Sequence, residues 1–207
     1  PLPELAEYLD RATFVNKDMD VCEFTNLQKH DLNLVLQKRY ALLNWQQGSG
    51  KTAAVYQRAK YLLKFNKVRN VIVLAPAIAT NMTWEPFLRN NREPYRLLRS
   101  YTDFEDIPSG TFLIVSTSML CKLKRYLMKF IKLSARRLCL VFDESDEITN
   151  PISQRTRYIL AIFRRVKYKI LDTGTTTRNN ITELYSQFEL LYNNSVNMTC
   201  WSPRVYK

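Results

Sequence analysis

Short apolar runs alternate with longer amphipathic stretches along this chain. Five near-continuous apolar runs predict strands at Ala41–Trp45, Val71–Ala75, Phe112–Ser116, Leu138–Phe142 and Tyr168–Leu171. Runs without regular polar alternation are typical of strands that are buried on both faces. The pattern therefore favours an internal, parallel sheet.

The stretches between these runs carry apolar residues at helical spacing. They predict helices at Thr52–Phe65, Ser118–Ile131, Ser153–Phe163 and Asn180–Leu191. Regular alternation of strands and helices indicates an α/β fold, in which helices flank a parallel β-sheet on both faces. Ligands of such sheets bind beyond the carboxyl ends of the strands.

The length and composition suit one large domain. The chain has 207 residues, of which 46% are hydrophobic, and this is enough for a substantial core. It contains no apolar stretch long enough to span a membrane and no secretory signal, so we expect no membrane partner. Because it opens at Pro1 without an initiator methionine, we expect a piece of a longer polypeptide or a processed chain.

The cysteines are spaced irregularly. Cys22, Cys121, Cys139 and Cys200 form no CxxC pair, and His30 is the only histidine. This pattern argues against a zinc site of ordinary spacing. It suits a reducing, intracellular compartment such as the cytoplasm, the nucleus or a virus-infected cell.

The charge is strongly positive. There are 31 Lys and Arg against 19 Asp and Glu, which gives a formal net charge of +12. Such a surplus favours an acidic partner, most commonly nucleic acid. On charge alone, a basic protein without such a partner remains an equal alternative.

A candidate phosphate loop lies between the first predicted strand and the first predicted helix. It reads Gln47-Gly48-Ser49-Gly50-Lys51-Thr52, and it holds two of only four glycines in the chain. Glycines let successive N–H groups turn toward a phosphate, and the helix N-terminus adds partial positive charge. Lys51 would reach the β- and γ-phosphates and Thr52 would ligate Mg²⁺. Trp45 stands where the strict pattern has glycine, so the motif is incomplete.

A candidate acidic site follows the predicted strand Leu138–Phe142. Its residues are Asp143, Glu144, Ser145 and Asp146. A carboxylate at a strand end that faces a phosphate loop suits a Mg–nucleotide. Asp143 would hold the metal and Glu144 would activate the attacking water. The alternative interpretation is an acidic loop that caps a helix.

With both motifs present, the chain resembles the first RecA-like lobe of superfamily 2 helicases, and most closely the Swi/Snf-type ATPases. The resemblance rests further on Glu147–Pro151, on Tyr168–Thr175 with its Thr-Gly-Thr ending, and on Asn179–Tyr185. It covers roughly Phe24 to Leu191. It implies a P-loop NTPase lobe that binds ATP and Mg²⁺.

The resemblance also implies roles for further residues. Asp146, Thr173, Gly174 and Thr175 would couple the nucleotide state to the nucleic-acid face. Two segments resemble the DNA-facing loops of the family: Pro76–Asn81, with Pro76, Thr80 and Asn81, and the pair Thr117 and Ser118. The implied partner is double-stranded DNA, which would be bound without regard to sequence.

One departure concerns adenine. The family has a glutamine upstream of the phosphate loop, and Asp31 stands at the matching place, with Gln28 as a possible substitute. A carboxylate accepts from adenine N6 but cannot donate to N7. We therefore expect weaker selectivity for adenine. Thr176 also replaces the proline that usually follows Thr-Gly-Thr, which we regard as a minor change.

The expected organisation has three parts. Residues 1–23 form an N-terminal extension, residues 24–192 form the ATP-binding lobe, and residues 193–207 form a tail that leads toward an absent second lobe. The family's second RecA-like lobe carries an arginine finger worth roughly 10³–10⁵ in rate. Unless that lobe lies in the same or another chain, we expect ATP binding with poor hydrolysis.

Two alternatives remain open at this point. The first is the motor of a restriction endonuclease or of another superfamily 2 translocase, because those proteins share the phosphate loop and the acidic motif. The second is a non-catalytic, nucleotide-gated binding module for DNA or protein. Asp31, Trp45 and the missing lobe favour the second alternative, whereas the presence of Lys51 and Glu144 argues against it.

Overall fold

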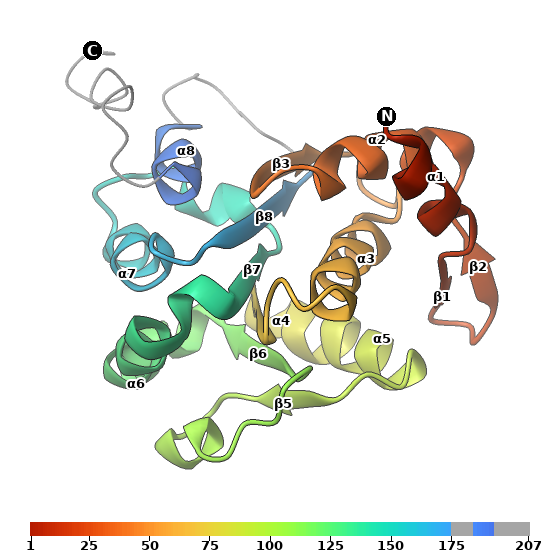
Figure 1. Cartoon of the computed structure of the whole chain (residues 1–207). Coiled ribbons are helices and arrows are strands. Elements are labelled where there is room, and N and C mark those ends of the chain that lie inside the picture. The colour runs from red at the N-terminus through yellow and green to blue at the C-terminus, as the bar shows by residue number, and fades with distance from the viewer. Residues whose placement is uncertain (175–183, 193–207) are drawn as a thin grey trace.

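The computed structural model describes residues 1–174 and 184–192. Its centre is a six-stranded parallel sheet in the order β3-β8-β7-β4-β6-β5 (Figure 1). The strands are β3 (Tyr40–Asn44), β4 (Asn70–Ala75), β5 (Tyr95–Leu97), β6 (Phe112–Ser116), β7 (Leu138–Phe142) and β8 (Tyr168–Thr173). The predicted α/β class is confirmed.

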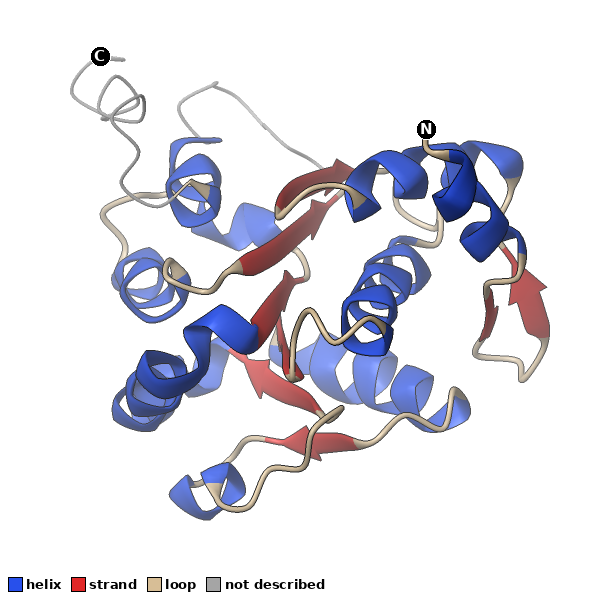
Figure 2. Ribbon diagram, in the orientation of Figure 1, coloured by secondary structure: helices blue, strands red, loops and turns tan. Residues whose placement is uncertain are grey.

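Helices cover both faces of this sheet (Figure 2). One layer holds α3 (Lys51–Lys64) and α5 (Glu85–Asn90), and the other holds α6 (Leu120–Ser134), α7 (Gln154–Phe163) and α8 (Tyr185–Leu191). The strands separate the two layers because alternate side chains point to opposite faces. In β4, Val71, Val73 and Ala75 join the core beneath α3, whereas Ile72 and Leu74 join the core beneath α6 and α7.

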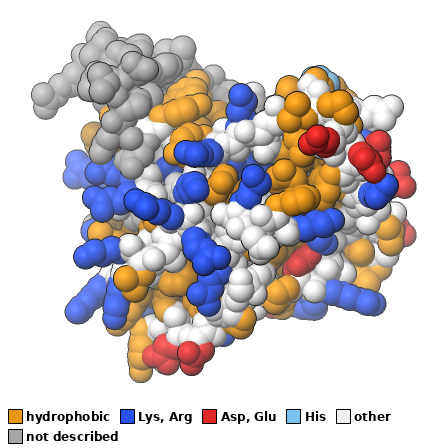
Figure 3. All heavy atoms as spheres, in the orientation of Figure 1, with side chains coloured by type: hydrophobic (Ala, Val, Ile, Leu, Met, Phe, Trp, Pro, Cys, Tyr) orange, Lys and Arg blue, Asp and Glu red, His pale blue; other side chains and the backbone are white. Residues whose placement is uncertain are grey.

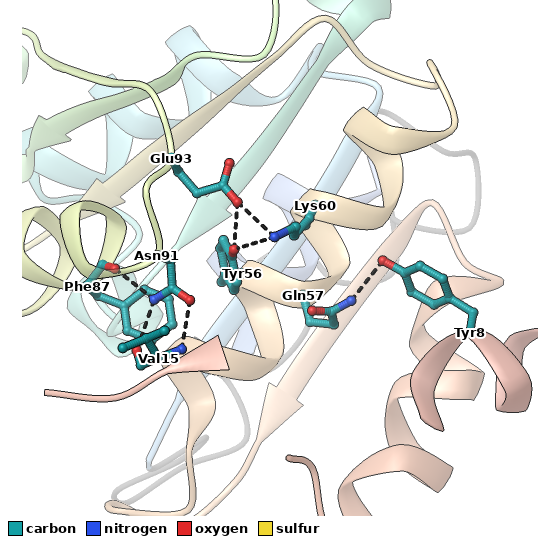
Figure 4. A network of polar contacts seen from close by, with 8 residues as sticks. All are labelled: Tyr8, Val15, Tyr56, Gln57, Lys60, Phe87, Asn91 and Glu93. Atoms are coloured by element: carbon teal, nitrogen blue, oxygen red, sulfur yellow. Dashed lines mark hydrogen bonds and ion pairs between the residues drawn. The ribbon is translucent and has the colours of Figure 1, made fainter. Parts of the chain in front are cut away.

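The N-terminal segment packs against the layer of α3 and α5. It contains α1 (Pro3–Asp10), a hairpin of β1 (Thr13–Val15) and β2 (Val21–Glu23), and then α2 (Asn26–Leu36). Figure 4 shows how polar contacts attach it: Gln57 on α3 donates to Tyr8 at 2.8 Å, and Asn91 exchanges two hydrogen bonds with the backbone of Val15. Leu5 and Leu9 belong to the same core as α3. Residues 1–23 are therefore integrated into the packing of the lobe.

A buried tyrosine anchors the same region. Tyr56 on α3 donates to Glu93 at 2.7 Å, and Glu93 also pairs with Lys60 at 3.0 Å (Figure 4). Burial, together with Glu93, raises the pKa of the Tyr56 hydroxyl. The hydroxyl is consequently a donor at neutral pH, and it links α3 to the segment that leads into β5.

The structure corrects one prediction about local conformation. We expected a loop at Pro76–Asn81, but residues 77–90 form a continuous helical stretch of α4 (Ala77–Ala79), a π-helical turn (Thr80–Trp84) and α5. Pro86 has no N–H to continue a regular hydrogen-bond ladder, and the N–H of Glu85 bonds instead to the carbonyl of Thr80. Single π-turns of this kind are frequent at functional sites.

Within residues 1–174 and 184–192, no helix is both long and apolar enough to cross a membrane. Cys22, Cys121 and Cys139, the cysteines in that part of the chain, are free thiols. The predicted tail at residues 193–207 lies outside the described residues.

Candidate functional site

The candidate phosphate loop connects β3 to α3. Gly48 and Gly50 have φ angles of +81° and +82°, where any other residue would be strained. Gly50 is the N-cap of α3, so that the helix begins at Lys51 with its free N–H groups at the loop. Within the loop, the Ser49 hydroxyl donates a hydrogen bond to the carbonyl of Gln46 at 2.6 Å. The sequence thus builds the conformation that an anion requires, with glycine at both positions of positive φ.

The two residues considered for adenine occupy different places. Gln28 belongs to a capping box with Thr25 at the start of α2, and its Nε2 donates to the carbonyl of Ser49 at 2.9 Å. The carboxylate of Asp31 accepts from the indole of Trp45 at 3.0 Å. Gln28 therefore contacts the phosphate loop directly, whereas Asp31 contacts Trp45, which precedes the loop in the sequence. The capping signal Thr25-x-x-Gln28 could have predicted α2 from the sequence.

The acidic motif begins where β7 ends. The N–H of Asp143 still bonds to Leu74 of the neighbouring strand at 2.9 Å. The Asp143 side chain is only 6% exposed, and it accepts a 2.7 Å hydrogen bond from the indole N–H of Trp84. Trp84 is itself fully buried, so it packs in the core and is not available to stack on a base. The indole donor holds Asp143 in one orientation.

Glu144 adopts an unusual backbone conformation, with φ 54° and ψ 52°. A residue other than glycine in this region costs about 1–3 kcal/mol, and such residues cluster at functional sites. Burial raises the pKa of its carboxyl group, and Asp143 raises it further, whereas Lys51 lowers it. A raised pKa suits a group that must accept a proton near neutral pH.

A third carboxylate lies beside these two, and we did not predict it. Asp172 is the fifth residue of β8 and is fully buried. Burial and the nearby Asp143 raise its pKa well above the ordinary value. Its Oδ1 accepts from the N–H of Glu144 at 3.3 Å. Aspartate is rarely buried without a role or a partner. An acidic residue within an apolar run was therefore the signal in the sequence that could have indicated a site residue here.

The ending of β8 meets the phosphate loop. Because β3 and β8 are paired neighbours, with Asn44 opposite Thr173, the residues directly after the two strands, Trp45 and Gly174, lie at the same edge of the sheet. A Cβ atom built on Gly174 would lie 3.2 Å from Nζ of Lys51. Thr173 is buried, while Asp146 is half-buried in the 3₁₀ turn Ser145–Ile148. Thr175 lies outside the described residues.

A cavity of about 620 Å³ opens over these groups. Gln47, Lys51, Thr52, Asp143 and Glu144 line it, together with residues of the β1–β2 hairpin and of the stretch Ala79–Asn90. The volume is in the range of pockets that hold ligands of nucleotide size. Mg²⁺ usually binds through one or two protein ligands together with phosphate oxygens and water. The Thr52 hydroxyl and the Asp143 carboxylate at the same wall fit that requirement.

A second cavity, of about 370 Å³, lies at the ends of β4 and β6. Thr80, Asn81 and Ser118, three of the residues predicted to contact nucleic acid, line it, and so do Arg99 and Lys122, which the sequence analysis does not include. Asn81 and Ser118 are exposed, and Pro76 is half-buried.

The two threonines of this predicted face are less accessible. Thr80 and Thr117 are buried, and the Thr80 hydroxyl donates to Ala77 at 2.7 Å. The accessible donors at this cavity are therefore Asn81 and Ser118 together with the two basic side chains Arg99 and Lys122.

Known proteins are similar to this chain in sequence and in fold. No protein-family model matches the sequence. The chain is 29% identical over 177 residues to the ATP-dependent helicase FUN30 of Saccharomyces cerevisiae, and the match covers 79% of this chain and 15% of that protein. The chain thus spans only a small part of the length of this relative.

Solved structures match over most of the chain. A SWI2/SNF2 ATPase core from Sulfolobus solfataricus, solved in complex with double-stranded DNA, superposes with a TM-score of 0.65 at 18% identity, over 84% of this chain and 36% of that chain. The UvsW helicase of bacteriophage T4 superposes with a TM-score of 0.64 at 13% identity, over 91% of this chain and 64% of that one. The fold is that of a RecA-like lobe, and the resemblance to the Swi/Snf-like superfamily 2 ATPases is confirmed.

Proposed function

We propose that this chain is the ATP-binding motor lobe of a Swi/Snf-like, nucleic-acid-dependent ATPase, in which Mg²⁺-dependent ATP hydrolysis is coupled to movement on DNA. One observation carries the proposal: Lys51, Thr52, Asp143 and Glu144 line a single cavity at the carboxyl edge of the sheet. That set supplies phosphate binding, metal binding and water activation together. An acidic turn alone, or a glycine-rich turn alone, would not supply all three of these functions.

Each residue has a separate task in this proposal. The N–H groups of the phosphate loop and the start of α3 bind phosphate oxygens, and Lys51 adds a positive charge. Mg²⁺, when bound by Thr52 and Asp143, supplies charge neutralisation on the phosphates. Glu144 orients the attacking water and accepts its proton. Gln28 steadies the loop through Ser49, and Asp31 remains the proposed cause of weak adenine selectivity.

Movement on DNA needs two further components. The first is a phosphate-binding surface, for which Asn81, Ser118, Arg99 and Lys122 are the proposed contacts. The second is a second RecA-like lobe, in the same or another chain, that supplies an arginine finger. The similarity to a SWI2/SNF2 core solved with double-stranded DNA supports a duplex as the partner.

Nucleotide binding is tested with Lys51→Ala. Calorimetry with Mg·ATP should show loss of measurable binding at concentrations that saturate the parent chain, with an unchanged melting temperature, because Lys51 is half-buried in an open cavity. Lys67→Ala, at an exposed lysine just beyond the same helix, should bind normally. Equal affinity in Lys51→Ala and the parent would contradict the assignment of the phosphate loop.

Hydrolysis is tested with Glu144→Gln under single-turnover conditions in the presence of the second RecA-like lobe, without which hydrolysis is expected to be poor. This variant should bind Mg·ATP as tightly as the parent, because the side chain keeps its size, and should lose at least about 10²-fold in rate, as removal of a general base does. Glu147→Gln, in the 3₁₀ turn that follows Glu144, should hydrolyse at the parent rate. If Glu144→Gln retains the parent rate, the nucleotide-gated binding module becomes the better interpretation.

A further inference from the structure

Asp172 is a buried carboxylate that the proposed roles do not yet use. It follows Leu171, which pairs with Phe142 in the parallel register of β7 and β8. Asp172 therefore reaches the carboxyl edge of the sheet beside Asp143, the residue after Phe142. It lies one strand away from the water-activating group and two residues before Gly174, which faces Lys51.

Asp172 meets the acidic motif at two points, the Asp143 side chain, which helps to raise its pKa, and the main chain of Glu144. Its Oδ1 accepts from the N–H of Glu144 at 3.3 Å. Glu144 has left-handed backbone angles, which residues with a Cβ atom seldom adopt. Such a conformation persists only when surrounding contacts hold it in place. The carboxylate of Asp172 makes such a contact from the neighbouring strand.

Packing alone does not account for an aspartate at this position. Ile170 and Leu171, the two residues before it, are fully buried and apolar. Among the described residues, the second carboxylate oxygen, Oδ2, has no hydrogen-bond partner. A buried polar atom without a partner destabilises a fold, and an apolar side chain of similar size would avoid that penalty. The carboxylate therefore has a use that offsets its burial.

We propose that Asp172 is a positioning residue, whose carboxylate fixes the main chain of Glu144 and thereby aims the Glu144 side chain at the attacking water. The inference rests on the proposed hydrolytic function and deepens it. Asp172 itself touches neither substrate nor water. Its contribution is the hydrogen-bond acceptor at Oδ1, which an asparagine can replace and a leucine cannot.

The matched pair Asp172→Asn and Asp172→Leu tests this role. Hydrogen exchange measured by NMR reports the Glu144 amide directly and needs no catalytic activity. In Asp172→Leu the Glu144 amide should exchange about tenfold faster or more, while the amides of β7 and β8 keep their protection. Single-turnover hydrolysis should fall roughly 10- to 100-fold, the scale of effect that a small misplacement of a reacting group produces. The affinity for ATP measured without Mg²⁺ should stay within about twofold, because the phosphate loop is untouched.

Asp172→Asn should restore both the exchange rate and the hydrolysis rate to near the parent values. If Asp172→Leu does not fold, Asp172→Ala removes the same acceptor without adding bulk and is held to the same expectations. The proposal is overturned if the variant without the acceptor keeps the parent exchange and hydrolysis rates. It is also overturned if Asp172→Asn falls as far as Asp172→Leu, since charge or packing would then be responsible.

The parent chain and Glu144→Gln separate the two levels of inference. If the parent binds no Mg·ATP, the proposed function is wrong. If the parent binds and hydrolyses ATP in a manner that depends on Glu144, while Asp172→Leu hydrolyses normally, only the positioning role is wrong.

Discussion

At the scale of single residues, the site depends on donors that hold carboxylates in place. Trp84 is the clearest case, because its indole N–H lies 2.7 Å from Oδ2 of Asp143 and both side chains are buried. A hydrogen bond to a charged group contributes about 1.5–3 kcal/mol, and removal of one partner leaves the other without compensation. We therefore expect the tryptophan to serve the proposed Mg²⁺ site as well as the core.

Trp84→Phe tests this dual role. It keeps an aromatic ring in the core but removes the donor, so we expect a decrease of about 1–3 kcal/mol in the free energy of unfolding. The Mg²⁺ concentration needed for half-maximal ATP binding should rise severalfold, because Asp143 is no longer held in one orientation. Urea denaturation and a Mg²⁺ titration measure the two effects.

Trp45→Phe provides a matched control. Trp45 also donates its indole N–H to an aspartate, Asp31, but the pair is only partly buried. Its removal should cost less stability and leave the Mg²⁺ dependence unchanged. A Trp84→Phe variant with the parent's Mg²⁺ dependence would show that the hydrogen bond serves packing alone.

At the scale of elements, the sequence predicted the strands and helices that have a regular apolar pattern, and it missed the elements that are short or polar. The runs Phe112–Ser116 and Leu138–Phe142 coincide with β6 and β7, because burial on both faces demands unbroken apolar residues. The strand β5 has three half-buried residues at the sheet edge, too few for a periodic signal. The motifs could be placed on the edge of the sheet because they directly follow such runs.

Other parts of the site could not be predicted from the sequence for physical reasons. Asp172 sits in a buried strand where the pattern expects an apolar residue, and its value depends on a neighbour 28 positions away. The bond from Trp84 to Asp143 spans 59 positions. Contacts of this kind arise from the order of the strands, which local patterns do not determine.

A buried lysine at the junction of β8 and α8 should make the free energy of unfolding depend on pH. Lys169 is buried, and its Nζ donates to the carbonyls of Arg164 and Leu190 at 2.5 and 2.6 Å, with Leu191 at 3.4 Å. Burial lowers the pKa of Lys169 to about 8. Between that value and the ordinary lysine pKa, near 10.4, the unfolded chain binds more protons than the folded chain, so the free energy of unfolding rises with pH.

Comparison of the parent with Lys169→Met isolates this effect. From pH 8 to about 10.4 the parent should gain up to roughly 3 kcal/mol relative to the variant, the value that a shift of about two pKa units implies. Below pH 8 the difference between the two proteins should be constant. Denaturant unfolding across this range provides the measurement, and parallel curves would contradict the assigned pKa.

At the scale of the whole molecule, the positive charge is concentrated in two segments. Residues 107–142 and 148–171 contain 13 of the 31 basic residues and none of the 19 acidic ones, so the rest of the chain is close to neutral. These segments include α6 and α7, which pack against each other. Figure 3 shows Lys and Arg side chains gathered over this part of the surface. The net charge of +12 thus comes from these two segments.

One face of α6 extends this charge away from the cavity at the ends of β4 and β6. Lys122 lines that cavity, and Arg125, Lys129 and Lys132 follow at spacings of three or four residues, all exposed. Residues at this spacing share one face of a helix. The stripe therefore continues the proposed nucleic-acid surface in a single direction.

Neutralisation of the stripe tests whether it binds phosphates. In the variant that carries Lys122→Gln, Arg125→Gln and Lys129→Gln, the salt dependence of binding to labelled duplex DNA should flatten by about 0.7–0.9 in log–log slope for each phosphate that is no longer neutralised. Binding by the parent should be weak, indifferent to sequence and absent at moderate salt, because one lobe neutralises few phosphates. A control that removes Lys38, Lys64 and Lys67, which are exposed outside the two segments, carries the same change in net charge. If the control flattens the slope equally, long-range charge alone is responsible. If the parent does not bind even at low salt, DNA is not the partner of the two basic segments.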